Sequence, residues 1–237
     1  MMHRAVFLDR DRTIIEDPGY ISDPSLVRLL PGADLAIKSL RQGGYLAVVV
    51  TNQSAIARGL ITEEVLEKIH GEMRRQLAAS VGAHLDAVYY CPFHPEGTVE
   101  PYAVDSEDRK PHPGMLLRAA KDLDIDLTAS WMVGDSPGDI EAGQRAGCRT
   151  IRIRVLGTAE TTATDDESVQ PDFAVRNLLE AAKIILQATP RASRPGALAA
   201  SAGPSGAGGP EAAMTDREIL QEILRQVREL VRRMGKD

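Results

Sequence analysis

The chain is poor in cysteine, in long apolar runs and in positive charge, and each shortage excludes a class of protein. Two cysteines in 237 residues, Cys91 and Cys148, are too few for a disulfide framework. No apolar run approaches the ~20 residues of a membrane-spanning helix. The net charge of −6 argues against a surface for nucleic acid or anionic membrane. Because the N-terminus also leaves no room for a signal peptide, we expect a cytoplasmic protein without nucleic-acid or membrane partners.

What the sequence does contain is an alternation of short apolar runs and helical patterns. The runs are typical of strands buried on both faces of a parallel sheet: AVFL, LAVVVT, DAVYYC, SWMVGD and CRTIRI. The helical patterns lie between or after them, at 33–42, from the N-cap Thr62 to about Ser80, from Pro113 to Leu123, at 139–146 and at about 177–187. This alternation predicts an α/β fold, a Rossmann-like parallel sheet flanked by helices.

The composition changes after this predicted domain, which covers residues 1–187. Of the 26 residues at 188–213, 21 are Ala, Gly, Pro or Ser, which predicts a disordered linker. Residues 214–237 predict an amphipathic C-terminal helix with apolar residues at heptad spacing. Both fold-back onto the domain and self-association or partner docking through 215–234 are open, although a helix packed beside the domain needs no such tether.

Acidic, hydroxyl and basic side chains stand where the predicted strands end. They are Asp9 and Asp11 after AVFL, Thr51 and Asn52 at the end of LAVVVTN, Arg109 and Lys110 before the helix at Pro113, and Asp135 and Asp139 after SWMVG. Ligands collect at the carboxyl ends of strands in open α/β sheets. Carboxylates bind Mg²⁺ and attack phosphorus, and cations hold phosphoryl oxygens. Each feature alone fits an ordinary turn, including an N-cap at Asp139, but their joint occurrence favours phosphate chemistry.

The segments DRDRT, VVVTNQSAIARG, DRKPHPGM and MVGDSPGD resemble the haloacid-dehalogenase-type phosphatases over about residues 5–157. Within that family the likeness is strongest to the phosphatases of D-glycero-D-manno-heptose 1,7-bisphosphate, with the histidinol-phosphate phosphatases as near relatives. The resemblance implies the haloacid-dehalogenase fold without a large cap domain. It also implies a Mg²⁺-dependent phosphoric monoester hydrolase that removes the 7-phosphate from a small phosphorylated sugar. The long loop before Arg109 favours the sugar over histidinol phosphate, and a binding or scaffold protein with weakened catalysis is the alternative.

The same resemblance implies a role for each of these residues. Asp9 would be the nucleophile and would form an aspartyl phosphate, and Asp11 would act as general acid and then general base. Thr51 and Lys110 would hold the phosphate oxygens. The implied Mg²⁺ ligands are Asp9, the backbone carbonyl of Asp11 and Asp135, with Asp139 acting through water. The implied substrate contacts are Asn52 and Arg109.

Four residues depart from the pattern of that family. Arg12 replaces the glycine of DRDGT, and Ile15, Ala55 and Ser136 replace a usual asparagine, glycine and lysine. We expect the Arg12 side chain to be tolerated and to point away from the metal, or else to lie near the mouth of the site and favour an anionic substrate. The other three departures bear on substrate identity rather than on the chemistry.

The loop after Cys91 departs furthest, because relatives bind a structural zinc there through C-x-H and C-x-C. Here only Cys91 remains. The other three ligand places hold residues that are neither cysteine nor histidine: Phe93, Ser106 and Asp108. His94 lies one residue away from the expected place, so we expect no structural zinc. The loop then needs contacts of its own, for which Phe93 and Tyr102 are candidates.

Overall fold

The computed structural model describes residues 2–154, 169–188 and 225. The disordered linker expected at 188–213 and the amphipathic helix expected at 214–237 fall outside these residues, apart from Ala188, which ends a helix, and Arg225, which is helical and exposed. The domain boundaries inferred from composition therefore stay predictions.

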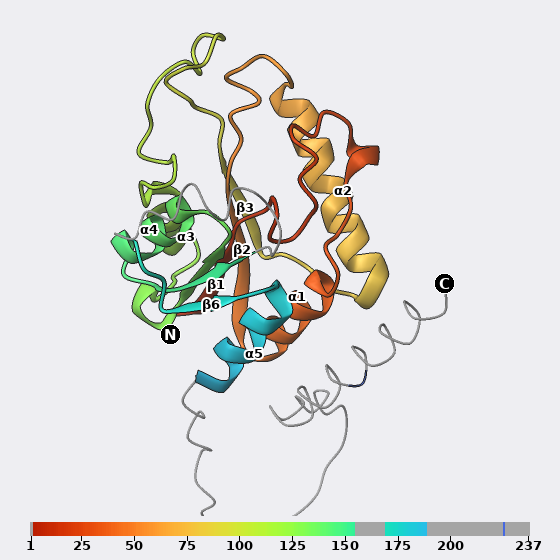
Figure 1. Cartoon of the computed structure of the whole chain (residues 1–237), viewed down its shortest axis with the longest axis vertical. Helices are drawn as coiled ribbons and strands as arrows, with labels where there is room; N and C mark the ends of the chain where they lie inside the picture. The colour runs from red at the N-terminus through yellow and green to blue at the C-terminus, as the bar shows by residue number, and fades with distance from the viewer. Residues whose placement is uncertain (1, 155–168, 189–224, 226–237) are drawn as a thin grey trace, which may run out of the picture.

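The described part of the chain contains one sheet of six parallel strands, as the apolar runs predict (Figure 1). The strands are β1 Arg4–Leu8, β2 Tyr45–Asn52, β3 Ala87–Cys91, β4 Trp131–Gly134, β5 Arg149–Ile153 and β6 Phe173–Val175. Their order is β3-β2-β1-β4-β5-β6. The chain moves outward in one direction from β1 to β3 and in the other from β4 to β6. The carboxyl ends of β1 and β4 therefore flank the switch point, where ligands bind in such sheets.

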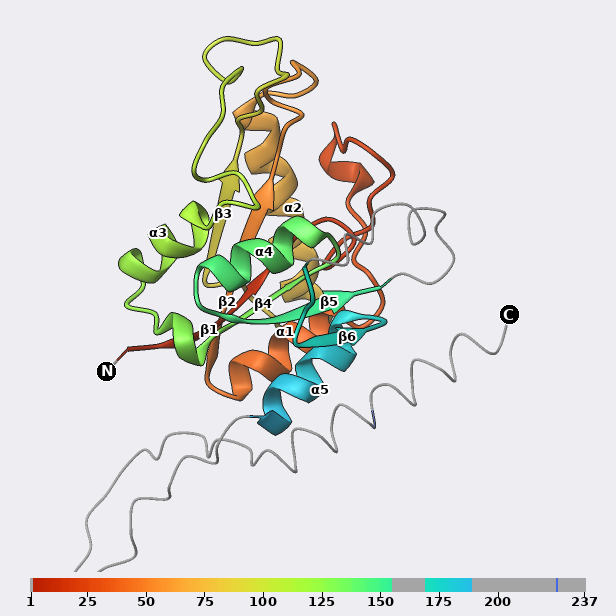
Figure 2. The same ribbon diagram turned by 60° about the vertical axis from the view of Figure 1, so that its left-hand side comes forward.

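Helices cover both faces of the sheet, which gives three layers (Figure 2). The helices are α1 Ala33–Gln42, α2 Glu63–Val81, α3 Gly114–Asp122, α4 Pro137–Arg145 and α5 Leu178–Ala188, with short 3₁₀ turns at Pro24–Leu26 and Leu127–Ala129. Val6 and Leu8 of β1 pack in the core below α1, α2 and α5, whereas Phe7 points into the core below α3 and α4. None of the helices in the described ranges is long and apolar enough to cross a membrane.

Local capping signals fix where two of these helices begin. The Thr62 hydroxyl accepts a hydrogen bond from the Val65 N–H at 3.4 Å, which makes Thr62 the predicted N-cap of α2. The start predicted for α4 at Asp139 is wrong, because this helix begins at Pro137. Ser136 is its N-cap, and the Asp139 side chain accepts from the Ser136 N–H at 3.0 Å in a capping box.

A long loop at 92–113 leaves β3 and extends beyond the carboxyl ends of the strands (yellow-green in Figure 1). The rings of Phe93 and Tyr102 lie 5.9 Å apart between centroids, and the His94 N–H donates to the Tyr102 carbonyl at 3.1 Å. The Tyr102 hydroxyl donates to Glu63 Oε1 of α2 at 2.8 Å. Side-chain and backbone contacts therefore hold the loop in place, and the two aromatic residues that we singled out are among them.

Candidate active site

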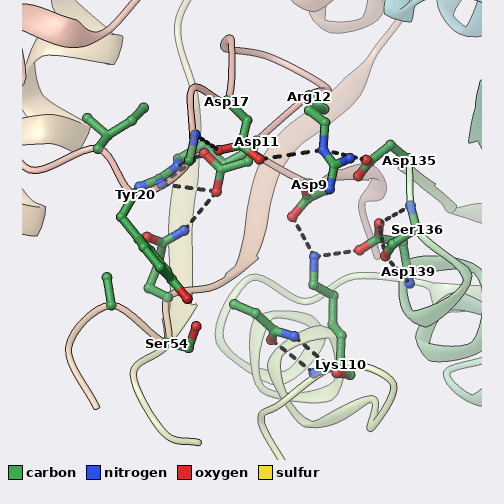
Figure 3. A pocket seen from close by; sticks show the side chains of 16 residues that line it. Asp9, Asp11, Arg12, Asp17, Tyr20, Ser54, Lys110, Asp135, Ser136 and Asp139 are labelled. Carbon is green, nitrogen blue, oxygen red and sulfur yellow. Dashed lines mark hydrogen bonds and ion pairs between the residues drawn. The ribbon is translucent and has the colours of Figure 1, made fainter. Parts of the chain in front are cut away.

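A cavity of about 350 Å³ opens at the switch point of the sheet (Figure 3). Its lining comes from the last residue of β2 and from the segments that follow β1, β2 and β4, with Lys110 from the long loop after β3. The lining residues are Asp9, Arg10, Asp11, Arg12, Asp17, Gly19, Tyr20, Ile21, Asn52, Gln53, Ser54, Ala55, Lys110, Asp135, Ser136 and Asp139. The structure thus brings together six of the eight residues that the sequence predicts for the site.

Lys110 is buried and connects the two aspartates at the floor of this cavity. Its Nζ lies 2.6 Å from Asp9 Oδ1 and 2.6 Å from Asp139 Oδ1, and it donates to the Val50 carbonyl at 2.8 Å. Burial lowers the pKa of Lys110, but the carboxylates of Asp139 and Asp9 more than offset this effect, and the pKa is raised above its usual 10.5. Lys110 therefore stays charged and fixes the position of the Asp9 carboxylate.

The backbone of Lys110 is itself held by a side chain from the neighbouring strand. Asn52 donates through Nδ2 to the Lys110 carbonyl and accepts through Oδ1 from the Lys110 N–H, both at 3.0 Å. Asn52 lines the cavity, as expected of a substrate contact, but both ends of its amide are already engaged with the protein. In this structure Asn52 orders the loop that carries the lysine.

Asp139 comes from α4, one turn beyond the end of β4, and can reach Lys110 only because of a glycine. A Cβ atom at Gly134 would lie 2.4 Å from Asp139 Cγ, far inside contact distance. The other carboxylate oxygen, Oδ2, accepts from the Ser136 N–H at 3.0 Å and from the Ser136 hydroxyl at 2.7 Å. The turn between β4 and α4 therefore sets the direction of this carboxylate.

Three carboxylates converge closely enough to bind one metal ion. Ligand atoms of Asp9, Asp135 and Asp139 all lie within 4.8 Å of one another, and this is the one such group of three or more potential ligands within the described ranges. Burial raises the pKa of Asp9 above its usual 3.8, against the opposing effect of Lys110. Burial and then Asp139 raise the pKa of Asp135 to about 6, against Arg12 and Lys110. The neighbouring cations therefore do not fully offset the burial and mutual repulsion of these carboxylates. A group of oxygen donors of this kind fits Mg²⁺.

Asp11 lies beside the nucleophile candidate but has different partners. Arg10 grips both of its oxygens, with Nε–Oδ1 and Nη2–Oδ2 distances of 3.0 Å, and Gln53 Nε2 donates to Oδ2 at 3.0 Å. Buried His70 of α2 accepts from Arg10 Nη1 at 3.3 Å, and its pKa is lowered to about 3 by burial, Arg10 and Arg74. Arg10 and Gln53, whose roles the sequence analysis missed, therefore orient Asp11. Their positions immediately after β1 and β2 were the available signal.

Two predicted site residues do not line the cavity. Thr51 is buried, and its Oγ1 accepts from Gln53 Nε2 at 2.8 Å, so it supports the site from behind. The Arg109 guanidinium donates to the Phe93 carbonyl at 3.4 Å, within the long loop. Their proposed contacts with phosphate and substrate stay predictions, and both would require the side chains to reach the cavity when it is filled.

Arg12 does not point away from the metal ligands, so our expectation on this point is wrong. Its Nε lies 3.0 Å from Asp135 Oδ2 and 3.5 Å from Asp17 Oδ2 (Figure 3). The backbone of Arg12 has a φ of 55°, in the left-handed region that favours glycine. Asp17, which lies outside every motif, attracts this guanidinium together with Asp135, and no pattern in the sequence predicts that contact.

The other departures from the family pattern lie in different places. Ala55 and Ser136 line the cavity, whereas Ile15 is fully buried in the core and does not. In the long loop, His94 Nδ1 accepts from the Glu96 N–H at 3.0 Å, and Nε2 lies 3.4 Å from Arg58 Nη2. His94 Nδ1 is thus engaged by a backbone donor, and the absence of a structural zinc stays a prediction.

Comparisons with known proteins agree with this geometry. A family model described as HAD-hydrolase-like matches residues 108–181. The D-glycero-beta-D-manno-heptose-1,7-bisphosphate 7-phosphatase of Pasteurella multocida (strain Pm70) is 40% identical over 184 residues, which cover 78% of this chain and 97% of the relative. A D-glycero-alpha-D-manno-heptose-1,7-bisphosphate 7-phosphatase of Burkholderia mallei (strain ATCC 23344) is 41% identical over 169 residues, which cover 71% and 89%.

A solved structure has the same fold. The D,D-heptose 1,7-bisphosphate phosphatase from B. bronchiseptica, complexed with magnesium and phosphate, superimposes with a TM-score of 0.67 at 32% identity. The match covers 78% of this chain and 99% of that structure. The match to relatives over nearly their full length decides the assignment. The chain belongs to the D-glycero-D-manno-heptose-1,7-bisphosphate 7-phosphatase family of haloacid-dehalogenase-like hydrolases.

Proposed function

We propose that this chain is a Mg²⁺-dependent phosphatase that removes the 7-phosphate from D-glycero-D-manno-heptose 1,7-bisphosphate through an aspartyl phosphate on Asp9. The observation that carries the proposal is the Asp9 carboxylate held by Lys110 at 2.6 Å on the floor of a polar cavity that Asp11 also lines. The names of the relatives support the choice of substrate. Asp9, Asp135 and Asp139 are the residues that would hold the metal, directly or through water.

In the first half of the reaction, an Asp9 oxygen attacks the phosphorus of the 7-phosphate. A P–O bond forms to Asp9, and the P–O bond to the sugar breaks. Asp11, in its protonated form, donates its proton to the departing sugar oxygen. Lys110 offsets negative charge at the nucleophile, and bound Mg²⁺ supplies further electrostatic stabilisation of the phosphoryl oxygens.

In the second half, Asp11 works as a base. It takes a proton from a water molecule, whose oxygen attacks the phosphorus and breaks the P–O bond to Asp9. Inorganic phosphate and the free Asp9 carboxylate result, and Asp11 is protonated again for the next turnover. Because Arg10 and Gln53 occupy both oxygens of Asp11, this residue must give up one hydrogen bond when it reaches the substrate.

Phosphate release from a panel of substrates tests this proposal. The panel contains both anomers of the heptose 1,7-bisphosphate, fructose 1,6-bisphosphate and histidinol phosphate, each with Mg²⁺. We expect the highest kcat/KM for a heptose bisphosphate, and the relatives include enzymes named for each anomer. Preference for histidinol phosphate, or no turnover of any member, would refute the assignment.

Asp9→Asn provides the matched test of the nucleophile. An amide cannot form the acyl phosphate, so we expect turnover to fall by at least a thousandfold, about 4 kcal/mol in the barrier. Lys110 keeps its ion pair with Asp139, so the variant should fold and melt cooperatively. Activity within tenfold of the unmodified chain would exclude Asp9 as the nucleophile.

A further inference from the structure

Arg12 places a positive charge among the residues that would bind the metal. Its Nε lies 3.0 Å from Oδ2 of Asp135, a member of the group of three converging carboxylates. The same nitrogen lies 3.5 Å from Asp17 Oδ2, on the other side of the guanidinium. In Figure 3 the Arg12 head group lies above Asp9, between Asp17 and Asp135. One cation is therefore shared by two carboxylates, only one of which belongs to the metal group.

The net charge of the cavity lining bears on how Arg12 affects metal binding. The lining includes five aspartates, Asp9, Asp11, Asp17, Asp135 and Asp139, and three cations, Arg10, Arg12 and Lys110. The formal excess is two negative charges, which equals the charge of one divalent ion. Arg10 is tied to Asp11, and Lys110 lies between Asp9 and Asp139. Of these three cations, Arg12 is the one paired with Asp135. Its positive charge disfavours the binding of a metal ion at that carboxylate.

The Arg12 side chain is more exposed to solvent than the other two cations of the cavity. The Arg12 side chain is 42% exposed, whereas that of Lys110 is 4% exposed. A partly exposed guanidinium on a flexible stem can move at small cost, because water replaces its lost partner. Asp17 already lies close enough to accept it when Asp135 turns to another cation. One position of the side chain therefore lies close to both aspartates, and a small movement toward Asp17 would release Asp135.

We propose that Arg12 and Mg²⁺ compete for Asp135, and that Asp17 receives the Arg12 guanidinium when the metal binds. Arg12 then acts as a positioning residue that weakens metal affinity, and Asp17 reduces that effect. The inference rests on the metal site of the proposed function, but it concerns binding rather than turnover. It predicts that two neighbouring single substitutions change Mg²⁺ affinity in opposite directions.

Melting of the full-length, metal-free chain at increasing Mg²⁺ concentration tests this without substrate, because a ligand that binds only the folded state stabilises it by RT ln(1 + [L]/Kd), so the dependence of Tm on Mg²⁺ concentration gives the dissociation constant. Arg12→Gln removes the charge and keeps an unbranched polar side chain, which is shorter by two atoms. We expect it to lower the Mg²⁺ dissociation constant about tenfold, within the usual range of coupling between two sites. Arg12→Lys keeps the charge and serves as the matched control, for which we expect a change of less than about twofold.

Asp17→Asn tests for the opposite change in Mg²⁺ affinity. Loss of this carboxylate removes the acceptor that would receive Arg12 when Asp135 binds the metal, so we expect Mg²⁺ to bind about threefold more weakly, and the effect should largely vanish in Arg12→Gln/Asp17→Asn. Equal Mg²⁺ affinity of Arg12→Gln and the unmodified chain would overturn the proposal, as would an equal effect of Asp17→Asn in both backgrounds. Should Arg12→Gln not fold, unchanged affinity in Asp17→Asn would overturn it alone.

The result can be separated from the outcome of the substrate panel. A chain that hydrolyses no sugar phosphate but shows the opposite shifts in Mg²⁺ affinity refutes the proposed function and supports the competition. If Mg²⁺ raises the Tm of neither the unmodified chain nor Arg12→Gln, both the metal site and the competition are refuted.

Discussion

The floor of the cavity and its rim are both built from ion pairs, but water reaches them to different extents. On the floor, the Lys110 side chain is 4% exposed and its two aspartate partners are almost as well covered. On the rim, the Arg12 side chain is 42% exposed and that of Asp17 is 24% exposed. Buried ion pairs hold one geometry because breaking them leaves an uncompensated charge, whereas exposed pairs exchange partners readily. The floor therefore fixes the nucleophile, and the rim can respond to ligands.

Substitution on the floor should have the largest effect on stability. Lys110→Met leaves Asp9 and Asp139 facing each other without a cation, and removal of one partner from a buried ion pair costs about 3–5 kcal/mol. We expect the free energy of unfolding of the metal-free chain, measured in urea, to fall by that amount. The matched control is Lys121→Met, the same change at an exposed lysine of α3, with an expected loss under about 0.5 kcal/mol. Equal losses for the two would refute the contrast.

The pH dependence of stability should show a smaller effect, at the carboxylate that Arg12 contacts. The pKa of Asp135 is raised from 3.8 to about 6, so the folded chain holds this proton more tightly than the unfolded chain does. That contribution to stability is complete below pH 3.8 and is lost as pH rises through about 6. Asp9 shifts in the same direction.

We therefore expect the stability attributable to Asp135 to fall between about pH 4 and pH 6 in the metal-free chain. The measurement is the urea unfolding free energy of the unmodified chain minus that of Asp135→Asn at each pH. A difference that is independent of pH, or that rises with pH, would contradict the raised pKa of Asp135.

Substitution on the rim should have the smallest effect on stability. Asp17→Asn removes one partner of a guanidinium that keeps Asp135, and exposed ion pairs contribute roughly 0–1 kcal/mol. We expect a loss of under about 0.5 kcal/mol in urea unfolding without metal. A loss as large as that of Lys110→Met would show that the rim is as rigid as the floor.

The sequence predicted those parts of the fold and site that depend on local signals. The bounds of α1, the Thr62 cap of α2 and the acids after β1 and β4 follow from residues close together in the chain. The three-residue strand β6 was missed, since it is too short to show a pattern. The direction of Arg12 depends on Asp135, which is distant in sequence and is brought close by the pairing of β1 with β4. Contacts of this kind follow from tertiary structure rather than from local pattern.

Two residues whose hydrogen-bond partners differ from the prediction show the same limit of local sequence patterns. The motifs that contain Asn52 and Arg109 predict both residues as substrate contacts. The Asn52 amide is engaged with the Lys110 backbone, and the Arg109 guanidinium with the Phe93 carbonyl. A motif specifies which side chain is present near a site, whereas its hydrogen-bond partners depend on how two loops pack together.

The double hydrogen bond between Asn52 and the backbone of Lys110 also bears on how substrate preference can change. It fastens the far end of the long loop to β2 directly at the lysine, while the near end of the loop continues from β3. Because Asn52 holds the Lys110 backbone directly, we expect the lysine to keep its position when residues at 92–108 are replaced. The loop can therefore vary independently of the lysine. Replacing residues 92–108 with the loop of another family member should change substrate preference while Lys110 stays in place.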